Sequence, residues 1–122
     1  MLSKQFRLKK KYQFNYVYRV GKSLGGKLMI LYYTPSKNTN VKVGISVSKK
    51  IGHAVVRNRT KRRIREAVYP SLAKLKPNFN LVLIAKNAIV DASFDAIKSE
   101  LKYLLKKANL YDNTEKSAKG DN

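Results

Sequence analysis

The stretch KKIGHAVVRNRTKRRIRE, residues Lys49–Glu66, decides the fold because it combines a dense basic block with a narrow apolar stripe. Eight of its eighteen residues are Lys or Arg, and its first acidic residue is the last one. A block of one sign this dense either repels itself into disorder or meets a polyanion. On a helix turning about 100° per residue, four residues share one side: Val56, Thr60, Ile64 and Ala67. We therefore predict an ordered helix that docks on a sheet and presents its cations outward.

The composition predicts one folded, basic domain. A chain of 122 residues can build a single core but not two, and 43% hydrophobic residues suffice to offset the entropy of folding. A net charge of +20 implies a polyanionic partner, with nucleic acid as the first candidate. Eighteen Lys or Arg residues precede Glu66, whereas all seven acidic residues lie from Glu66 onward. The binding surface is therefore expected in the first half of the chain.

Several classes of protein are disfavoured by the same composition. The absence of cysteine excludes disulfides and zinc–thiolate sites and fits a reducing compartment. The basic N-terminus is not followed by an apolar run of signal-peptide length, and no window is apolar enough to span a membrane. We expect a cytoplasmic protein with no membrane partner and no small-molecule substrate.

The N-terminal half predicts a short helix rich in aromatic residues. From Lys10, the side chains of Phe14, Val17 and Tyr18 follow helical spacing, and Gly21 is a plausible C-cap. Aromatic rings also occur at Tyr12 and Tyr16, so one face of the helix cannot bury all of them. An exposed ring beside many cations is the arrangement that stacks the bases of single-stranded nucleic acid.

The rest of the sequence predicts three strand regions and a final helix. Leu24–Thr34 and Val41–Val47 are predicted as strands of an antiparallel hairpin, and the first divides in two if Gly25-Gly26 forms a bend. Asn80–Ala85 is expected to be a strand buried on both faces, and Ser93 is expected to cap the last helix. That helix packs an apolar stripe on the sheet and turns a solvated Lys face outward.

The predicted fold class is α+β, an α/β sandwich. Three helices are expected to pack with a small mixed, mostly antiparallel four-stranded sheet. Residues 1–110 form the single domain, and residues 111–122 are expected to be a disordered tail because they show no hydrophobic periodicity.

The basic half lacks the residues of a protein catalyst. It contains one His, no Cys and no acidic residue, so it offers neither a carboxylate cluster for Mg²⁺ nor a pair of groups for acid–base hydrolysis. The acids Asp91, Asp95 and Glu100 are explained by a helix start and a helix surface. We therefore predict no catalytic residue and no metal ligand. Arg outnumbers Lys between Arg57 and Arg65, and its planar fork grips phosphate.

A family resemblance adds to this interpretation. Val43–Gly52 reads VGISVSKKIG and is followed by Ala54-Val55, Arg57-Asn58-Arg59, Lys61-Arg62 and Arg65-Glu66. An N-terminal element, RLKK at Arg7–Lys10, precedes Phe14. In this order and spacing the residues resemble the signature of the bacterial ribonuclease P protein subunit, over nearly the whole chain apart from the tail.

The resemblance implies a subunit of a ribonucleoprotein endoribonuclease whose RNA carries the catalytic centre. Such a complex removes the 5′ leader of precursor tRNA with Mg²⁺ held mainly by the RNA and substrate. The implied fold has a left-handed strand–helix–strand crossover around the basic helix, against the usual hand. The implied leader contacts are Phe14, Tyr18 and Tyr32, with Tyr18 standing where other members carry Phe. The implied contacts to the catalytic RNA are Lys49, Lys50, Arg57, Asn58, Arg59, Lys61, Arg62 and Arg65.

Two other functions compete with this one. A basic ribosomal or other rRNA-binding protein without an associated reaction has the same composition, and only the Lys49–Glu66 signature separates the two. Sequence-specific DNA binding is weaker, because the basic helix is preceded by a strand and not by the first helix of a helix-turn-helix.

Overall fold

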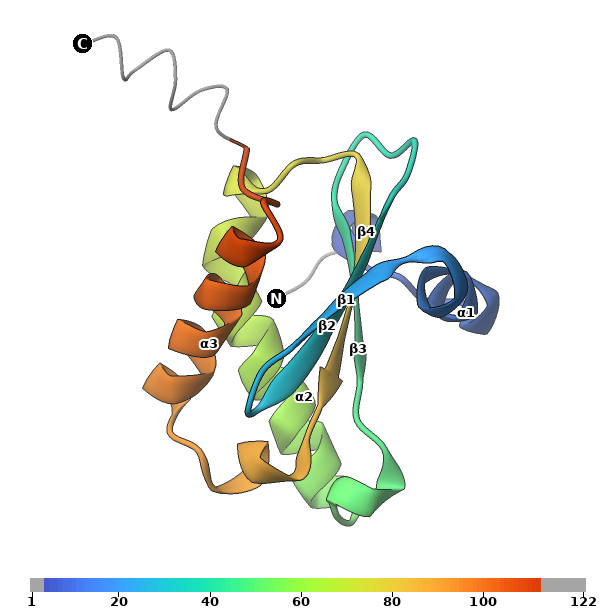
Figure 1. Ribbon diagram of the computed structural model, residues 1–122. Helices are drawn as coiled ribbons and strands as arrows, with labels where there is room; N and C mark the ends of the chain where they lie inside the picture. Colours follow the sequence, from blue (N-terminus) through green and yellow to red (C-terminus); the bar gives the residue numbers. More distant parts are fainter. Residues whose placement is uncertain (1–3, 113–122) are drawn as a thin grey trace, which may run out of the picture.

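A computed structural model describes residues 4–112, which form a four-stranded sheet between two layers of helices (Figure 1). Its strands are β1 (Lys22–Gly25), β2 (Met29–Pro35), β3 (Lys42–Ser46) and β4 (Phe79–Ala85), in the order β1-β2-β4-β3. The helices are α1 (Lys11–Val20), α2 (Ala54–Val68) and α3 (Phe94–Lys107). Helix α1 lies on one face of the sheet, whereas α2 and α3 cover the other. The predicted α+β class is confirmed.

The two faces of β4 explain this layering. Leu81 and Leu83 are fully buried among the residues under α2 and α3, while Val82 points to the opposite face and packs with Val17 of α1. A strand that is apolar on both faces needs cover on both sides, as the sequence predicted. Ser93 also caps α3 as predicted, because its Oγ accepts a hydrogen bond from the Ala96 amide at 3.0 Å.

The predicted hairpin of residues 24–34 with residues 41–47 is wrong. Strand β4 lies between β2 and β3, pairing antiparallel with β2 and parallel with β3. Strand β4, which is apolar from Leu81 to Ala85, takes the central position, whereas β3, whose Lys42 and Ser46 are only half-buried, takes an edge. The hairpin that does form is β1–β2, since the first apolar run divides after Gly25.

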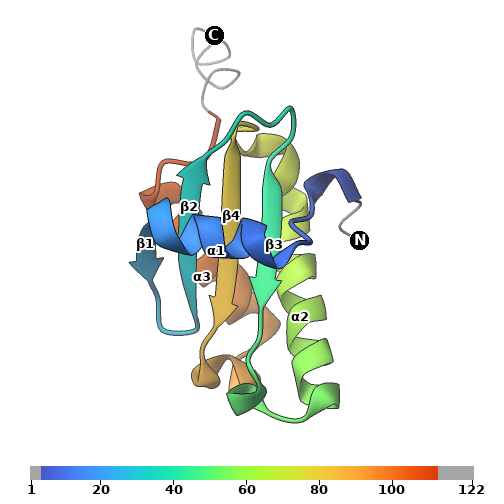
Figure 2. The same ribbon diagram turned by 90° about the vertical axis from the view of Figure 1, so that its right-hand side faces the viewer.

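The connection from β3 through α2 to β4 is left-handed. In Figure 2, β3 and β4 both run downward, β4 lies to the left of β3, and α2 passes behind the sheet. A right-handed crossover would place β4 on the other side of β3. This uncommon hand agrees with the expectation drawn from the family resemblance, and it leaves α2 beside the free edge of β3.

Glu100 of α3 holds the β1–β2 turn. Its Oε1 accepts the Lys27 amide at 2.8 Å, and its Oε2 accepts the amides of Leu28 and Met29 at 2.8 and 2.9 Å. A Cβ on Gly26 would lie 2.5 Å from this carboxylate, which is why glycine is needed there. Glu100 is half-buried on the side of α3 toward the sheet, so its predicted surface position holds only in part, and the sequence did not predict that its carboxylate ties α3 to the sheet.

The packed body extends slightly beyond its predicted end. Tyr111, assigned from the sequence to the tail, forms a β-bridge with Leu75, and its hydroxyl lies 3.3 Å from Ser71 Oγ. The Asp112 amide donates to the Lys74 carbonyl at 2.7 Å. The rest of the predicted tail lies outside the described residues. Within residues 4–112, no helix has the length and apolar character needed to cross a membrane.

Candidate nucleic-acid interface

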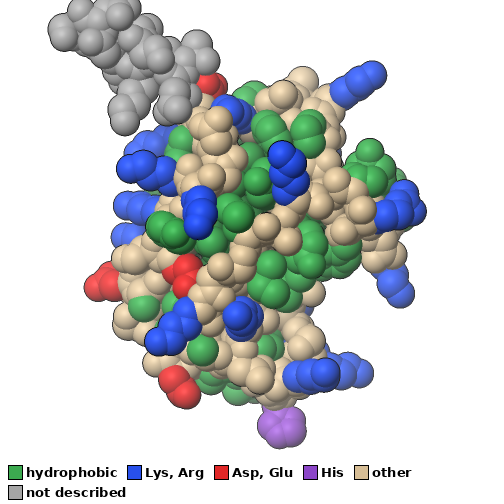
Figure 3. Space-filling view, in the orientation of Figure 1, with side chains coloured by type: hydrophobic (Ala, Val, Ile, Leu, Met, Phe, Trp, Pro, Cys, Tyr) green, Lys and Arg blue, Asp and Glu red, His purple; other side chains and the backbone are tan. Residues whose placement is uncertain are grey.

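Helix α2 presents the predicted basic face. Its inner side, formed by Thr60, Ile64, Ala67 and Val68, is buried against the core. Five of the predicted RNA contacts are exposed: Lys49, Lys50, Asn58, Arg59 and Arg62. Three are half-buried: Arg57, Lys61 and Arg65. Figure 3 shows Lys and Arg side chains spread over most of the visible face, with only a few Asp or Glu side chains among them.

Arg63 belongs to the structure of the domain more than to its binding face. Its guanidinium donates to the Ala92 carbonyl at 2.7 Å, which ties α2 to the loop before α3. This contact spans sequence positions that no local pattern connects. It explains why Arg63 is half-buried while its neighbour Arg62 is exposed.

The three predicted leader contacts lie together on the other face of the sheet. The strand register aligns Tyr32, Val82 and Gly44 in one row across β2, β4 and β3. Helix α1 lies along this row, across the strands (Figure 2), with Val17 packed on Val82 and the Tyr18 ring 5.2 Å from the Tyr32 ring, centroid to centroid. The rings of Tyr18 and Tyr32 meet edge to face at 72°.

Phe14 occupies the far end of the same row, over Gly44. A Cβ on Gly44 would lie 2.5 Å from the Phe14 ring, so the absence of a side chain at Gly44 leaves the space that this ring occupies. Phe14, Tyr18 and Tyr32 are each half-buried, so each residue keeps part of its surface open to solvent. We call this surface, formed by Phe14, Tyr18 and Tyr32, the aromatic groove.

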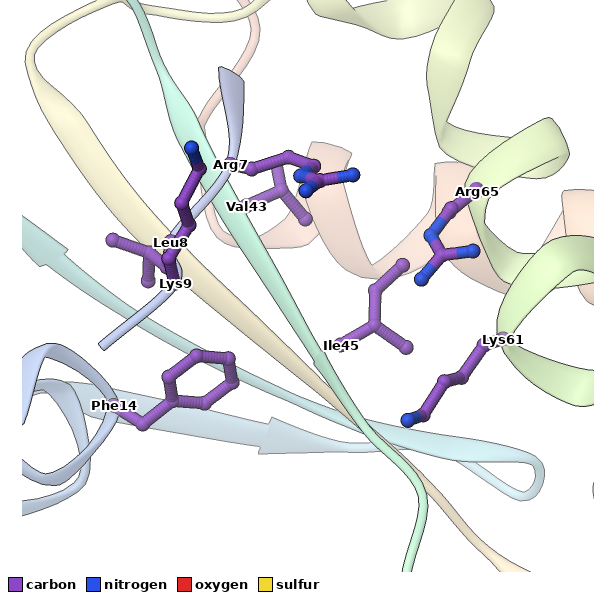
Figure 4. Close-up of a pocket in the computed structure, with 8 residues that line it drawn as sticks. All are labelled: Arg7, Leu8, Lys9, Phe14, Val43, Ile45, Lys61 and Arg65. Carbon is purple, nitrogen blue, oxygen red and sulfur yellow. The ribbon is translucent and has the colours of Figure 1, made fainter. Parts of the chain in front are cut away.

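A cleft of about 330 Å³ connects the aromatic groove to α2 at the edge of β3. Its lining residues are drawn in Figure 4: Arg7, Leu8, Lys9, Phe14, Val43, Ile45, Lys61 and Arg65. Lys9 and Phe14 lie on one side of β3, and Lys61 and Arg65 on the other. The predicted RNA-binding residues of α2 and the predicted leader-binding residues of α1 are therefore neighbours and share one cationic cleft.

Arg7 and Lys9 are members of this cleft that sequence reasoning left out of the site. The segment before α1 runs along β3, where Arg7 bridges to Val43 and the Leu8 amide donates to the Val43 carbonyl at 3.1 Å. Leu8 is buried, so its two neighbours point away from the core. The alternation of Arg7, Leu8 and Lys9 carried this signal in the sequence.

Among residues 4–112, no group of three or more His, Cys, Asp or Glu side chains is placed to hold a metal ion. His53 is exposed at the N-cap of α2, and its side chain makes no capping hydrogen bond there. What the site offers is positive charge, aromatic surface and hydrogen-bond donors.

A basic helix beside a cationic cleft and an aromatic groove defines a nucleic-acid-binding protein. Comparison with known proteins gives the family. The model of the family described as Ribonuclease P matches residues 2–109. The ribonuclease P protein component of Clostridium botulinum strain 657 is 42% identical over 110 residues, covering 89% of this chain and 99% of that protein. That of Shouchella clausii is 36% identical over 122 residues, covering 96% and 100%.

Comparison with solved structures gives the same family. The Staphylococcus aureus RNase P protein superposes with a TM-score of 0.80 at 31% identity, covering 88% of this chain and 98% of that one. The Thermotoga maritima RNase P protein gives a TM-score of 0.76 at 26% identity, covering 83% and 96%. This chain belongs to the ribonuclease P protein family. Its role is in processing the 5′ ends of tRNA, with RNA as its partner in a ribonucleoprotein. The family therefore favours this function over the alternative of a ribosomal or other rRNA-binding protein.

Proposed function

We propose that this chain binds the catalytic RNA of ribonuclease P through α2 and the 5′ leader of precursor tRNA through the aromatic groove. In this proposal the chain assists Mg²⁺-dependent endonucleolytic removal of the leader in the cytoplasm, and the catalytic centre belongs to the RNA. The observation that carries it is the cleft that joins Phe14 to Lys61 and Arg65. One surface can then hold the leader next to the RNA that cuts it.

The aromatic groove has the properties that a single strand requires. Its three half-buried rings offer faces and edges to unpaired bases, and stacking on an aromatic ring contributes about 1–3 kcal/mol per base. Arg7, Lys9 and Arg65 at the adjoining cleft can hold the leader phosphates. Because stacking is tolerant of base identity, we expect little sequence preference from the rings themselves.

The exposed part of α2 suits a structured RNA. Lys49, Lys50, Arg59 and Arg62 are exposed cations, and Asn58 between them can both donate and accept hydrogen bonds. Phosphate contacts of this kind release counterions, so the affinity should fall steeply with salt. In the proposal, Arg57, Lys61 and Arg65 continue this surface toward the leader.

Mg²⁺ is a cofactor of the complex in this proposal and not of the chain. The ion prefers carboxylates, phosphates and water, and no carboxylate cluster in the described part of the chain provides such a set. The RNA and the substrate phosphates are therefore the expected ligands. The chain's cations would act indirectly, by offsetting repulsion between two RNAs so that Mg²⁺ binds at lower concentration.

Substitution of the groove tests the proposal. Phe14→Ala with Tyr32→Ala should weaken binding of a leader-bearing precursor by the assembled complex at least fivefold, since one lost stacking contact is worth about 1 kcal/mol or more. Binding of mature tRNA should change little. Tyr103→Ala is the matched control, because Tyr103 is an exposed ring on α3, on the opposite face of the sheet. Equal losses for precursor and mature tRNA would contradict the assignment of the groove to the leader.

A further inference from the structure

A second hollow lies beside α1. It shares no lining residue with the aromatic groove or with the cleft at β3, although α1 contributes residues to all three. It has a volume of about 510 Å³ and lies between α1 and the end of the sheet, where Ser36 and Asn80 form part of its lining. Asn80 pairs with Thr34, two residue pairs along from the pair of Tyr32 with Val82 on which α1 sits, and therefore on the same face of the sheet. The hollow therefore occupies the part of the sheet face toward the β2–β3 loop.

The wall of the hollow on α1 consists of two tyrosines and an arginine. Tyr12 is 66% exposed and Tyr16 is 48% exposed, so neither ring is needed to complete the core. The Arg19 guanidinium carbon lies 5.8 Å from the centroid of the Tyr16 ring, within the range of a cation–π contact. The three side chains, at positions 12, 16 and 19, share one stripe of the helix. Aromatic faces beside a cation are suited to a base and its phosphate.

The opposite wall is a polar network that is already ordered. Ser36 Oγ donates to Asn38 Oδ1 at 3.0 Å, and Asn38 Nδ2 donates to Asn80 Oδ1 and to the Phe79 carbonyl. These contacts hold the Asn80 side chain in place at the edge of the hollow, and Asn15 of α1 also lines it. Carboxamide side chains carry both donors and acceptors, which is the chemistry that reads the edge of an unpaired base.

We propose that this hollow binds one unpaired RNA nucleotide, with the base on Tyr12 and Tyr16, its edge toward Asn80 and its phosphate on Arg19. The volume is in the range of about 300–1,000 Å³ that small-ligand sites occupy. Two sources can supply such a nucleotide: the leader, upstream of the part held in the aromatic groove, or a single-stranded segment of the catalytic RNA. The inference does not require the aromatic groove to bind the leader.

Two binding measurements on the full chain test the site and identify the source. The first is the dissociation constant of the protein with the catalytic RNA, and the second is the affinity of the assembled complex for precursors with leaders of increasing length. The variants are Tyr12→Ala with Tyr16→Ala, the corresponding double Phe variant, and Arg19→Ala. Tyr103→Ala is again the control, since Tyr103 is 58% exposed and carries Lys107 Nζ 5.6 Å from its ring centroid, much as Tyr16 carries Arg19.

The double Ala variant should lose about fivefold or more in one of the two measurements, because two stacking faces are removed. The double Phe variant should keep wild-type affinity, and Arg19→Ala should lose affinity in the same measurement as the double Ala variant. A loss that appears only in the second measurement, and only with longer leaders, identifies the leader as the source. A loss in the first measurement, the affinity of the protein for the catalytic RNA, identifies the catalytic RNA. Unchanged values in both measurements, or a loss no larger than that of Tyr103→Ala, would overturn the site. The groove variants at Phe14 and Tyr32 report on the leader proposal separately, so either idea can fail alone.

Discussion

Removal of the Glu100 carboxylate should loosen the β1–β2 hairpin and destabilise the whole domain. The carboxylate accepts three backbone amides, and those of Leu28 and Met29 belong to buried residues that water reaches poorly. A buried donor left without its charged acceptor costs about 1.5 kcal/mol, so Glu100→Ala should lower the free energy of unfolding by about 3 kcal/mol. The third amide, of Lys27, is exposed and can bond water instead.

The assay is thermal and urea unfolding followed by circular dichroism. A loss of about 3 kcal/mol corresponds to a fall in Tm of roughly 12–24 °C for a domain of this size. Glu100→Gln should cost only about 1 kcal/mol, because its carbonyl oxygen can take the place of Oε2 and keep two of the bonds. Asp95→Asn, in the exposed first turn of α3, is the control and should change stability by less than about 1 kcal/mol. If Glu100→Ala were as stable as Asp95→Asn, the hairpin would not depend on this carboxylate.

Three further substitutions separate binding from folding. Arg62→Ala, at an exposed cation, should reduce the slope of log affinity for the catalytic RNA against log salt by about 0.7–0.9, with unchanged stability in urea. Arg63→Ala should do the reverse, because it removes the bond to the Ala92 carbonyl: about 1.5 kcal/mol of stability is lost and the salt slope is kept. Gly44→Ala places a Cβ 2.5 Å from the Phe14 ring, so the ring must move by about 1 Å to restore contact distance. The affinity for precursor tRNA should then fall, while the affinity for mature tRNA should not change. Identical precursor affinities for wild type and variant would show that the position of the Phe14 ring over Gly44 does not affect leader binding.

The helices and the buried strand could be predicted because their signals are local. The apolar stripe of α2, with Ile64 and Ala67 on the inner side, follows from helical spacing alone. The apolar run from Leu81 to Ala85 in β4 predicts burial on both faces, and Ser93 predicts the start of α3. These patterns need no knowledge of which elements become neighbours.

The errors concern neighbours that are distant in sequence. Residues 41–47 alternate correctly for a strand, yet nothing local tells whether β2 or β4 pairs with it, and the short turn at residues 35–40 favoured the wrong partner. Glu100 reaches amides more than seventy positions away, so its spacing on α3 suggested only a surface residue. The residues of the aromatic groove were predicted only from the family resemblance. The cleft that links the groove to α2 was not predicted, because it forms only when the left-handed crossover places α2 beside β3.

The most direct test of the proposed function is reconstitution with a ribonuclease P RNA at low Mg²⁺. Cleavage of precursor tRNA should be measured with and without this chain, at equal RNA concentration and across a series of Mg²⁺ concentrations. The proposal predicts that the chain lowers the Mg²⁺ concentration needed for half-maximal cleavage at the leader junction, and that the gain shrinks when Phe14 and Tyr32 are replaced by Ala. Cleavage that is the same with and without the chain at every Mg²⁺ concentration would contradict it.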